Sequence, residues 1–461
     1  MNNTYRINPM EIKEMVALAR KAQKEYQATH NQQSVDNICR AAAKVIYENA
    51  EMLAREAVDE TGMGVYEDKV SKNRGKSKGV WYNLHDKKSV GILNIDERTG
   101  MIEIAKPMGV VGAVTPTTNP IVTPMSNIIF ALKTCNAIII SPHPRSKKCS
   151  KHAVDLILEA IKPFNVPEGM VQVIEEPSIE MTQQLMGAVD VVVATGGMAM
   201  VKSAYSSGKP SYGVGAGNVQ VIFDSDIDFE DAAEKVIYGR SYDNGIICTG
   251  EQSVIYNEAD KDAVFAALRK RGAYICTEEE GKKMRDLLFQ NGGPINKDVV
   301  GQGVQKIAKM AGINVPEGSR VIIVEANGVG EEDVICREKM CPVMCALSYK
   351  YFEEGVDIAC RNLANEGNGH SCAIHSNNQA HIILTGSKAT VSRIVVNAPS
   401  ATTAGGHIQN GLNVTNTLGC GSWGNNSISE NFTYKHLMNI SRIAPLNPAI
   451  KVPNDQEIWE L

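Results

Sequence analysis

The sequence predicts an α/β protein built on parallel sheets, and three observations support this fold class. Short apolar runs typical of strands alternate with segments of helical period from residue 110 to residue 223. The same alternation begins again at residue 252 and continues to residue 396. At 461 residues, the chain also exceeds the length of about 250–300 residues at which one hydrophobic core stops growing. Because the strand-like runs are almost entirely apolar, we expect sheets that are covered on both faces.

The N-terminal part of the sequence predicts helices followed by a β-hairpin. Apolar residues recur every three or four positions from Pro9 to about Thr61, which is the period of amphipathic helices. The basic stretch at residues 69–78 then predicts either a solvated helix face or a surface turned toward a ligand. Alternation at residues 89–95 and 101–106 predicts two strands joined by a turn.

Strands and helices alternate over most of the remaining chain. The first series has expected strands at residues 110–114, 137–140, 172–174, 189–194 and 219–223, and expected helices at residues 125–132, 151–161, 180–186 and 197–206. The second series has expected strands at residues 252–256, 320–324, 343–349, 373–375 and 393–396, and expected helices from Asp260 and Glu353. The tail from Asn410 is rich in Gly, Asn and Ser, so we expect loop with short elements.

Composition excludes several classes of function. The chain is 43% hydrophobic and 21% charged, which is ordinary for a soluble globular protein. A formal net charge of −5 gives no reason to expect nucleic acid or a membrane surface as partner. No apolar run approaches the roughly 20 residues that span a bilayer, and the N-terminus lacks the apolar core of a secretory signal. The 11 cysteines are scattered and form no Cys-x-x-Cys pair, so we expect no metal site, reduced thiols and a cytoplasmic protein.

Cys248 is the candidate nucleophile. It lies in the segment Asp-Asn-Gly-Ile-Ile-Cys-Thr-Gly at residues 243–250, after a turn-prone stretch and before a small polar residue and a glycine. A thiol at such a bend is open to a substrate, and adjacent backbone N–H groups can bind an oxyanion. Since free cysteines more often serve as buried packing residues, the interpretation depends on motifs elsewhere in the chain.

Polar or glycine-rich segments follow several expected strands, where open α/β sheets bind ligands. Ala-Thr-Gly-Gly at residues 194–197 opens a helix whose free N–H groups attract phosphate. Ser-Pro-His-Pro-Arg at residues 141–145 offers a hydroxyl, an imidazole and a guanidinium. The run Gly-Val-Gly-Ala-Gly-Asn at residues 213–218 precedes a strand, so a plain glycine-rich turn is as good an interpretation as a dinucleotide fingerprint.

Asn119 and His370 each allow two interpretations. Asn119, in Thr-Pro-Thr-Thr-Asn-Pro at residues 115–120, either donates its amide to an oxyanion or forms a turn. His370, in Glu-Gly-Asn-Gly-His-Ser at residues 366–371, is expected in a flexible polar loop. There it could bind a cofactor, move a proton or cap a helix.

These motifs occur in an order that resembles the aldehyde dehydrogenase superfamily, and within it the coenzyme-A-acylating branch. The similarity runs from about Glu11 to the end of the chain. It is carried by residues 116–120, 141–145, 194–197, 204–210, 243–248, 367–370 and 418–431. The chain is most similar to acylating succinate-semialdehyde and sulfoacetaldehyde dehydrogenases, and to the dehydrogenase half of bifunctional aldehyde–alcohol dehydrogenases.

The resemblance implies the aldehyde dehydrogenase fold and its domains. A Rossmann-like NAD(P)-binding domain is expected at residues 1–245, with a β-hairpin oligomerisation flap at about residues 87–108. An α/β catalytic domain is expected at residues 246–428, and a C-terminal oligomerisation tail at residues 429–461. The resemblance therefore also implies a homodimer or homotetramer.

The resemblance also implies roles for individual residues. Cys248 corresponds to the nucleophile and Asn119 to the oxyanion donor, and His370 is a candidate to deprotonate or position the thiol of coenzyme A. The residues expected to bind NAD or NADP are Thr115, Ser141, His143, Thr195, Gly196, Gly197, Gly213 and Glu338. The residues expected to hold the anion of the substrate are Lys76, Arg74 and Thr249.

One departure from hydrolytic relatives bears on the reaction. Those relatives carry a glutamate general base in the segment that corresponds to residues 213–218, where this chain has only Gly, Val, Ala and Asn. Without that carboxylate, water lacks a base to attack a thioester, so coenzyme A is the natural acceptor as co-substrate.

The expected reaction is the reversible oxidation of a short anionic aldehyde to its acyl-CoA, through a thioester on Cys248. Succinate semialdehyde and sulfoacetaldehyde are the expected substrates, and acetaldehyde or propionaldehyde is the alternative within the same class. Outside the class, the alternatives are a hydrolytic, acid-forming dehydrogenase and a non-catalytic filament or scaffold subunit.

Overall fold

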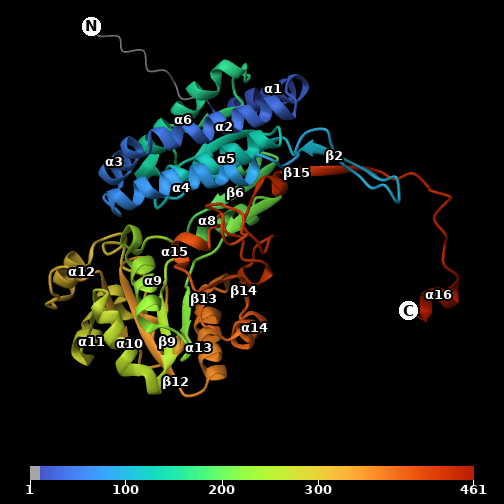
Figure 1. Cartoon of the computed structure of the whole chain (residues 1–461). Helices are drawn as coiled ribbons and strands as arrows, with labels where there is room; N and C mark the ends of the chain where they lie inside the picture. Colours follow the sequence, from blue (N-terminus) through green and yellow to red (C-terminus); the bar gives the residue numbers. More distant parts are fainter. Residues whose placement is uncertain (1–10, 461) are drawn as a thin grey trace, which may run out of the picture.

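The computed structural model describes residues 11–460 of the chain (Figure 1). In this part of the chain the strands form two parallel sheets, of five and seven strands, and one antiparallel sheet of three strands. Helices cover both parallel sheets, and the antiparallel sheet projects from the side of the five-stranded unit (Figure 1). The α/β class with parallel sheets is therefore as the sequence predicts.

The five-stranded sheet has the order β5-β4-β3-β6-β7, and every pairing in it is parallel. Its strands are β3 (Val110–Val114), β4 (Ala137–Ser141), β5 (Val171–Val173), β6 (Val191–Thr195) and β7 (Ser211–Val214). The chain runs outward from β3 to β5 and then returns to the other side of β3 with β6. The strand order therefore reverses between β3 and β6, which is where sheets of this kind bind ligands beyond the carboxyl ends of their strands.

Eight helices pack on the five-stranded sheet and on each other. They are α1 (Ile12–Thr29), α2 (Gln32–Glu48), α3 (Ala50–Thr61), α4 (Tyr66–Leu84), α5 (Val122–Lys133), α6 (Lys147–Ile161), α7 (Ile179–Ala188) and α8 (Met198–Tyr205). All residues of α5 are buried, because this helix lies between the sheet and the outer layer of α2, α4 and α6. A helix that is buried on every side needs such a position, whereas α2 buries only one stripe.

The seven-stranded sheet has the order β10-β11-β12-β9-β8-β13-β14 and is also parallel throughout. Its strands are β8 (Gln220–Phe223), β9 (Ser253–Asn257), β10 (Ala273–Ile275), β11 (Val321–Glu325), β12 (Val343–Tyr349), β13 (Gly369–His375) and β14 (Val391–Val396). Its helices are α9 (Phe229–Ser241), α10 (Lys261–Lys270), α11 (Glu278–Leu288), α12 (Val304–Ala311), α13 (Phe352–Asn365) and α14 (Gln379–Lys388). One apolar cluster joins the sheet to α9 and α10, and another joins its opposite face to α11, α12 and α13.

The boundary between the two units differs from the expected one at residue 245. Strand β8 was expected in the first series, but it pairs with β9 and β13 of the seven-stranded sheet. Helix α9 packs on that same sheet. The sheets therefore divide between β7 and β8, at residues 215–219, because the chain crosses over in the glycine-rich run before β8.

The antiparallel sheet contains the expected hairpin and a strand from the C-terminal tail. Strand β1 (Ile92–Ile95) pairs with β2 (Ile102–Pro107), and β2 pairs on its other side with β15 (Met438–Ile443). After the short helix α15 (Ser400–Thr403), the chain returns to the first unit, where Phe432 and Leu437 join its core. Beyond β15 it extends away from the body to the short helix α16 (Asp455–Trp459) (Figure 1). Among the described residues, no helix is both long enough and apolar enough to cross a membrane.

Candidate functional site

The nucleophile loop, which we define as residues 242–252, connects α9 to β9 and carries Cys248. Its first turn has three consecutive residues in the left-handed region, with φ angles of 52° at Asp243, 53° at Asn244 and 67° at Gly245. Asp and Asn adopt this conformation more readily than other non-glycine residues, which explains the Asp-Asn-Gly sequence. The turn directs the chain back across the end of the seven-stranded sheet, so that Cys248 lies before the amino end of β9.

A cavity of about 1150 Å³ lies between the two parallel-sheet units and gathers several of the predicted residues. Asn119, which follows β3 of the first unit, lines it together with Cys248 of the second. Lys76 of α4 and Thr249 also line it. The site is thus made by segments that are far apart in the sequence and that meet at the junction of the two sheets.

Cys248 is partly exposed to this cavity, and its thiol is strongly affected by its surroundings. Burial raises the pKa of the Cys248 thiol to about 12, and the nearby Glu338 carboxyl raises it further, while Arg393 and Lys76 act in the opposite direction. Burial thus disfavours the nucleophilic thiolate, whereas the positive charges of Arg393 and Lys76 favour it.

The glycine-rich run at residues 213–218 packs directly against the nucleophile. A Cβ atom at Gly217 would lie 1.9 Å from the carbonyl oxygen of Cys248, so no larger residue fits there without a shift of the loop. The Gly217 N–H also donates a hydrogen bond to the carboxyl of Glu338. This run is therefore a structural support for the nucleophile and does not form a dinucleotide fingerprint.

Asn119 lies in the wall of the cavity that Cys248 also lines. It lies in the turn between β3 and α5, and its Oδ1 is buried without a hydrogen-bond partner among the described residues. Since Asn119 and Cys248 line the same cavity, the Asn119 amide can donate to an oxygen that develops negative charge next to the thiol.

Lys76 brings a positive charge into the cavity. Its ammonium donates to the carbonyl oxygens of Gly405 at 2.8 Å and Thr415 at 3.0 Å. No carboxylate among the described residues lies within 4.0 Å of the Lys76 ammonium. Burial lowers the pKa of Lys76 to about 8, an effect that Cys248 opposes. The charge of this lysine is thus held by dipoles alone, which leaves it available to an anionic ligand.

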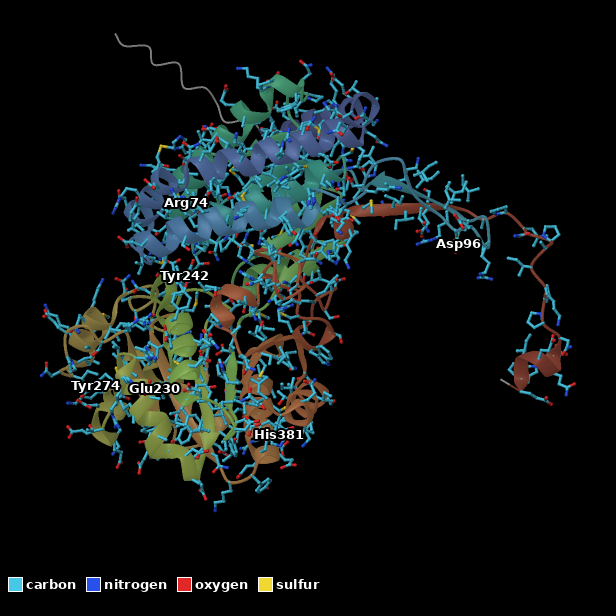
Figure 2. All side chains as sticks on the ribbon, viewed as in Figure 1. Arg74, Asp96, Glu230, Tyr242, Tyr274 and His381 are labelled. Carbon is cyan, nitrogen blue, oxygen red and sulfur yellow. The ribbon has the colours of Figure 1, made fainter. Side chains whose placement is uncertain are left out.

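Arg74 does not reach the cavity, contrary to the expectation that it joins Lys76 there. Two residues along a helix correspond to a rotation of about 200°, so Arg74 and Lys76 point to opposite sides of α4. Arg74 is exposed and forms an ion pair of 2.8 Å with Glu51 of α3 on the outer helical layer (Figure 2). The basic stretch at residues 69–78 therefore has one solvated face and one face turned inward.

Thr249 lines the cavity, but its hydroxyl is used within the protein. Thr249 Oγ1 donates a hydrogen bond of 3.0 Å to the carbonyl oxygen of Ala401. This bond ties the nucleophile loop to α15, whose residues form part of the cavity wall. The structure therefore gives Thr249 a supporting role instead of the expected contact with the anion.

His370 does not lie in a flexible loop. It is the second residue of β13 and is fully buried, with Nδ1 at 3.0 Å from the hydroxyl of Ser371 and Nε2 without a partner among the described residues. Burial lowers the pKa of His370 to about 3, and Arg393 adds to the effect. His370 is not among the residues that line the cavity, so the structure does not place its imidazole where it could deprotonate an incoming thiol.

Arg393 is a site residue that the sequence reasoning missed. It lies in the middle of β14, faces the cavity and is almost fully buried. Its guanidinium donates to the carbonyl oxygens of His370, at 2.9 Å, and Gly419. A charged residue inside a mostly apolar strand was the available signal. With Lys76, Arg393 makes the cavity next to Cys248 electropositive.

The predicted cofactor residues gather at the carboxyl edge of the five-stranded sheet. Thr115, Ser141, Thr195 and Gly213 lie at the ends of β3, β4, β6 and β7, and strands of a parallel sheet all end at one edge. The buried Oγ1 of Thr115 has no partner among the described residues, so it is free to meet a ligand. This edge therefore fits a dinucleotide at the point where the strand order reverses.

The start of α8 is suited to a phosphate group. Gly197 is the N-cap of this helix, without a side-chain cap, so the first backbone N–H groups of the helix are open. A Cβ atom at Gly197 would meet nothing within 4 Å, and one at Gly196 would meet only the side chain of Met200. The residues present thus leave both space and donors for a pyrophosphate.

Three other predicted cofactor residues, at the same edge of the sheet, differ in their burial and contacts. The Ser141 hydroxyl is buried and hydrogen-bonded to Thr182 at 2.8 Å, whereas His143 is exposed and accepts the Arg145 N–H at 3.1 Å. Gly213 packs β7 against α8, since a Cβ there would lie 2.6 Å from Val201. The role of Gly213 is therefore close packing.

Glu338 comes from the second unit and lies before β12. Burial raises the pKa of its carboxyl to about 8, with a further contribution from Glu366, and Arg240 acts in the opposite direction. The Glu338 N–H donates to Glu366 at 2.7 Å. The Glu338 carboxyl is close enough to Cys248 to raise the pKa of its thiol.

Comparison with known proteins gives consistent matches over nearly the whole chain. The model of the aldehyde dehydrogenase family matches residues 1–417. An acetylating succinate-semialdehyde dehydrogenase of Clostridium kluyveri is 52% identical over 453 residues, which are 98% of this chain and 99% of that protein. A sulfoacetaldehyde dehydrogenase of an Acholeplasma species is 43% identical, over 93% of this chain and 90% of that protein.

Solved structures agree with these matches. An acetylating aldehyde dehydrogenase of Geobacillus thermoglucosidasius superposes with a TM-score of 0.91 at 36% identity, covering 96% of this chain and 98% of the other. A propionaldehyde dehydrogenase of Rhodopseudomonas palustris with bound propionyl-CoA superposes with a TM-score of 0.85 at 27% identity, covering 97% and 98% of the two chains. The chain is therefore similar in sequence and in fold to enzymes that act on aldehydes.

Proposed function

This chain belongs to the aldehyde dehydrogenase family and is a CoA-acylating oxidoreductase, and we propose that it acts on a short aldehyde with an anion at its far end. Succinate semialdehyde is the leading candidate, since the similar protein of Clostridium kluyveri is 52% identical and carries that substrate in its name. Sulfoacetaldehyde is the second candidate, by the likeness to the Acholeplasma protein. Acetaldehyde and propionaldehyde are the uncharged alternatives.

The single observation that carries the proposal is the Lys76 ammonium in the cavity of Cys248. It has carbonyl partners only, and Arg393 adds a second cation to the same cavity. A carboxylate about 4 Å from one such charge gains about 4 kcal/mol of Coulomb energy at an effective dielectric constant of about 20, before desolvation is counted. An uncharged aldehyde gains nothing from this charge, so the cavity favours an anion.

We propose that NAD or NADP binds along the carboxyl edge of the five-stranded sheet. The open N–H groups at Gly196 and Gly197 would hold the pyrophosphate, with Thr195 beside them. Ser141 and His143 would lie along the adenosine, Thr115 deeper in the edge, and Glu338 at the ribose nearer to Cys248. When bound, this cofactor supplies the acceptor for the hydride of the aldehyde.

The chain's own groups account for the other steps. The Cys248 thiolate adds to the aldehyde carbonyl, and the oxyanion accepts hydrogen bonds from the Asn119 amide and the Cys248 N–H. Lys76 holds the far end of the substrate. After oxidation the acyl group remains on Cys248 as a thioester, and the thiol sulfur of coenzyme A replaces Cys248 to release acyl-CoA. The reverse sequence reduces an acyl-CoA to the aldehyde.

The test is formation of reduced cofactor from succinate semialdehyde, sulfoacetaldehyde and acetaldehyde, each with and without coenzyme A. We expect turnover to require coenzyme A and to favour an anionic aldehyde. Lys76→Met should lower kcat/KM for the anionic aldehyde by about 10- to 100-fold, which is about 1.4–2.8 kcal/mol, and leave acetaldehyde nearly unchanged. Release of free acid without coenzyme A would contradict the acylating mechanism, and a lack of turnover with every aldehyde would favour a scaffold subunit.

The pH dependence gives a second test of the same charge. Since the pKa of Lys76 is about 8, the ammonium is present below this pH and is lost as the pH rises through it. The kcat/KM ratio of the anionic aldehyde to acetaldehyde should therefore fall above pH 8 in the wild type. It should stay flat in Lys76→Met. An equally steep fall in that variant would assign the titration to another group.

The assembly and location of the protein are further parts of the proposal. The three-stranded sheet leaves Ile92, Ile95 and Ile443 each more than half exposed, which supports association of at least two chains through this flap and the tail. All eleven cysteines are free, which supports a reducing compartment such as the cytoplasm. Size-exclusion chromatography with light scattering would measure the assembly, and a monomer at micromolar concentration would contradict it.

A further inference from the structure

The inward face of α4 carries three lysines, of which only two have a carboxylate partner. Lys69 and Lys72 both form ion pairs with Asp243, at 3.0 Å and 2.6 Å. The side chains of these residues are 3%, 7% and 0% exposed, so the cluster is shielded from water on all sides. We call these three residues the Asp243 clamp. Lys76, one turn further along the helix, is outside it.

Asp243 makes further contacts that join the nucleophile loop to α4. Its Oδ1 accepts the N–H of Val65, at the start of α4, at 2.8 Å. Its own N–H donates to the carboxylate of Asp68 at 2.8 Å. A Cβ atom at Gly64 would lie 2.0 Å from Asp243 Oδ1, so the chain before α4 is closely fitted to this carboxylate.

The backbone at the clamp is held in a conformation that it would not adopt alone. Asp243 and Asn244 are consecutive non-glycine residues in the left-handed region. Such a conformation costs free energy and persists only where surrounding contacts impose it, and it is concentrated at functional sites. The contacts with α4 are therefore what holds the first turn of the nucleophile loop in place.

The clamp is close along the chain to both groups that a substrate must reach at once. Cys248 follows Asp243 by five residues in the loop, and Lys76 follows Lys72 by one helical turn in α4. Lys72, Lys76 and Cys248 all line the same cavity. Because α4 belongs to the first unit and the loop to the second, the separation between the thiol and the ammonium depends on the contacts that join helix and loop, and the clamp supplies two of these as ion pairs.

From this arrangement we propose that the Asp243 clamp is a positioning device that selects the chain length of the substrate. It fixes the separation between the Cys248 sulfur and the Lys76 ammonium, and so determines which aldehyde places its carbonyl and its anion on the two groups together. The inference deepens the proposed function and rests on it.

A role in stability alone would not explain this cluster well. Buried ion pairs contribute little net stability, because the cost of removing the charges from water offsets their attraction. Their best-supported use is to fix one arrangement among several. The clamp has that property, since it joins a helix of one unit to a loop of the other.

The main experiment uses the double variant Asp243→Asn with Lys69→Met. It removes one negative and one positive charge together, so the net charge of the cluster stays the same. The remaining Lys72 ammonium faces an amide oxygen in place of the carboxylate of Asp243, and Asn accepts the left-handed conformation. The kcat/KM values are measured for malonate, succinate and glutarate semialdehydes and for acetaldehyde. We expect the preference for the best semialdehyde over its shorter and longer homologues to fall about tenfold, mainly through KM. The kcat with acetaldehyde should stay within about twofold.

A second variant and a matched control distinguish a loss of positioning from a loss of folding. Lys72→Met keeps the Asp243–Lys69 pair and removes only the shorter contact between helix and loop, and it should flatten the same chain-length profile. Glu51→Gln removes a different contact of α4, the exposed pair with Arg74, and should change nothing. Thermal unfolding of all variants shows whether they are folded. If the double variant is not folded, the chain-length profile of Lys72→Met tests the inference instead.

The outcomes separate this inference from the proposed function. If the wild type prefers anionic semialdehydes and the clamp variants keep its chain-length profile, the clamp is not the positioning device and the proposed function stands. If the wild type shows no preference for anionic aldehydes, both fail together. If acetaldehyde turnover falls as much as semialdehyde turnover, the clamp supports the loop in general and does not select chain length.

Discussion

The two parallel sheets use opposite edges to build the site. In the five-stranded sheet, the candidate ligand residues Thr115, Ser141 and Thr195 follow their strands, at the carboxyl edge. In the seven-stranded sheet, Cys248 and Glu338 precede their strands, at the amino edge. The cavity lies where these two edges face each other, since Asn119 reaches it from the first sheet and Cys248 from the second.

The difference shows how far the usual rule for such sheets extends. Ligands of open α/β sheets bind beyond the carboxyl ends of the strands, and the first sheet follows this rule. The second sheet does not, because its amino edge is the one turned toward the first sheet. Its reactive groups therefore lie in the segments that enter strands, and a search restricted to strand ends would have missed Cys248.

Replacement of Cys248 is the test with the largest expected effect on activity. If the amino edge supplies the nucleophile, Cys248→Ser should lower kcat by at least about 10³-fold, because no other cysteine of the described residues lines the cavity. Formation of reduced cofactor measures the rate, and intact-protein mass after incubation with acyl-CoA measures the acyl adduct. A variant that keeps a tenth of the activity or still gains the acyl mass would place the nucleophile elsewhere.

Asn119→Ala tests whether the first sheet takes part in the chemistry across the junction. Loss of one oxyanion donor costs about 10²–10³-fold in kcat. The KM for the cofactor should stay within about twofold, because Asn119 lies on the side of the thiol. Steady-state kinetics with a saturating aldehyde measures both values. A change in cofactor KM with an unchanged kcat would instead assign Asn119 to the cofactor edge.

Two glycine substitutions at the carboxyl edge of the five-stranded sheet have the smallest expected effects on activity and stability. Gly213→Ala places a methyl group 2.6 Å from Val201, so overpacking should lower the stability by about 1–3 kcal/mol. Gly197→Ala meets nothing within 4 Å and should leave the stability within about 0.5 kcal/mol. If the pyrophosphate binds at the start of α8, Gly197→Ala still raises the cofactor KM severalfold. Denaturant unfolding and cofactor titration measure the two effects, and an unchanged KM would remove Gly197 from the cofactor site.

The parts of the fold that depend on local pattern could be predicted from the sequence. Apolar runs predicted the strands, and alternation predicted the β1–β2 hairpin. The sheet to which a strand belongs depends on distant partners, and for this reason β8 was assigned to the first series although it pairs with β9 and β13. The crossing at residues 215–219 has no proline and no charge run to mark it.

The site was predicted by residue type more reliably than by orientation. Lys76 and Arg74 both carry a basic side chain, and only the helical rotation between them decides that one faces Cys248 and the other Glu51. His370 lies after two glycines and a polar residue, which is typical of a loop, but its backbone pairs in β13 and its ring is buried. The partner of Lys69 is 174 residues away, and nothing in the local sequence indicates it.

The absence of a carboxylate in the glycine-rich run at residues 213–218 has a thermodynamic consequence. Where water is not activated, the acyl group leaves Cys248 only by moving to another sulfur, so one thioester is exchanged for another of similar energy. The free energy released in oxidising the aldehyde is then conserved in the acyl-CoA instead of being lost as heat. No step of the cycle is strongly downhill, and the ratios of acyl-CoA to coenzyme A and of reduced to oxidised cofactor set the direction of net flux.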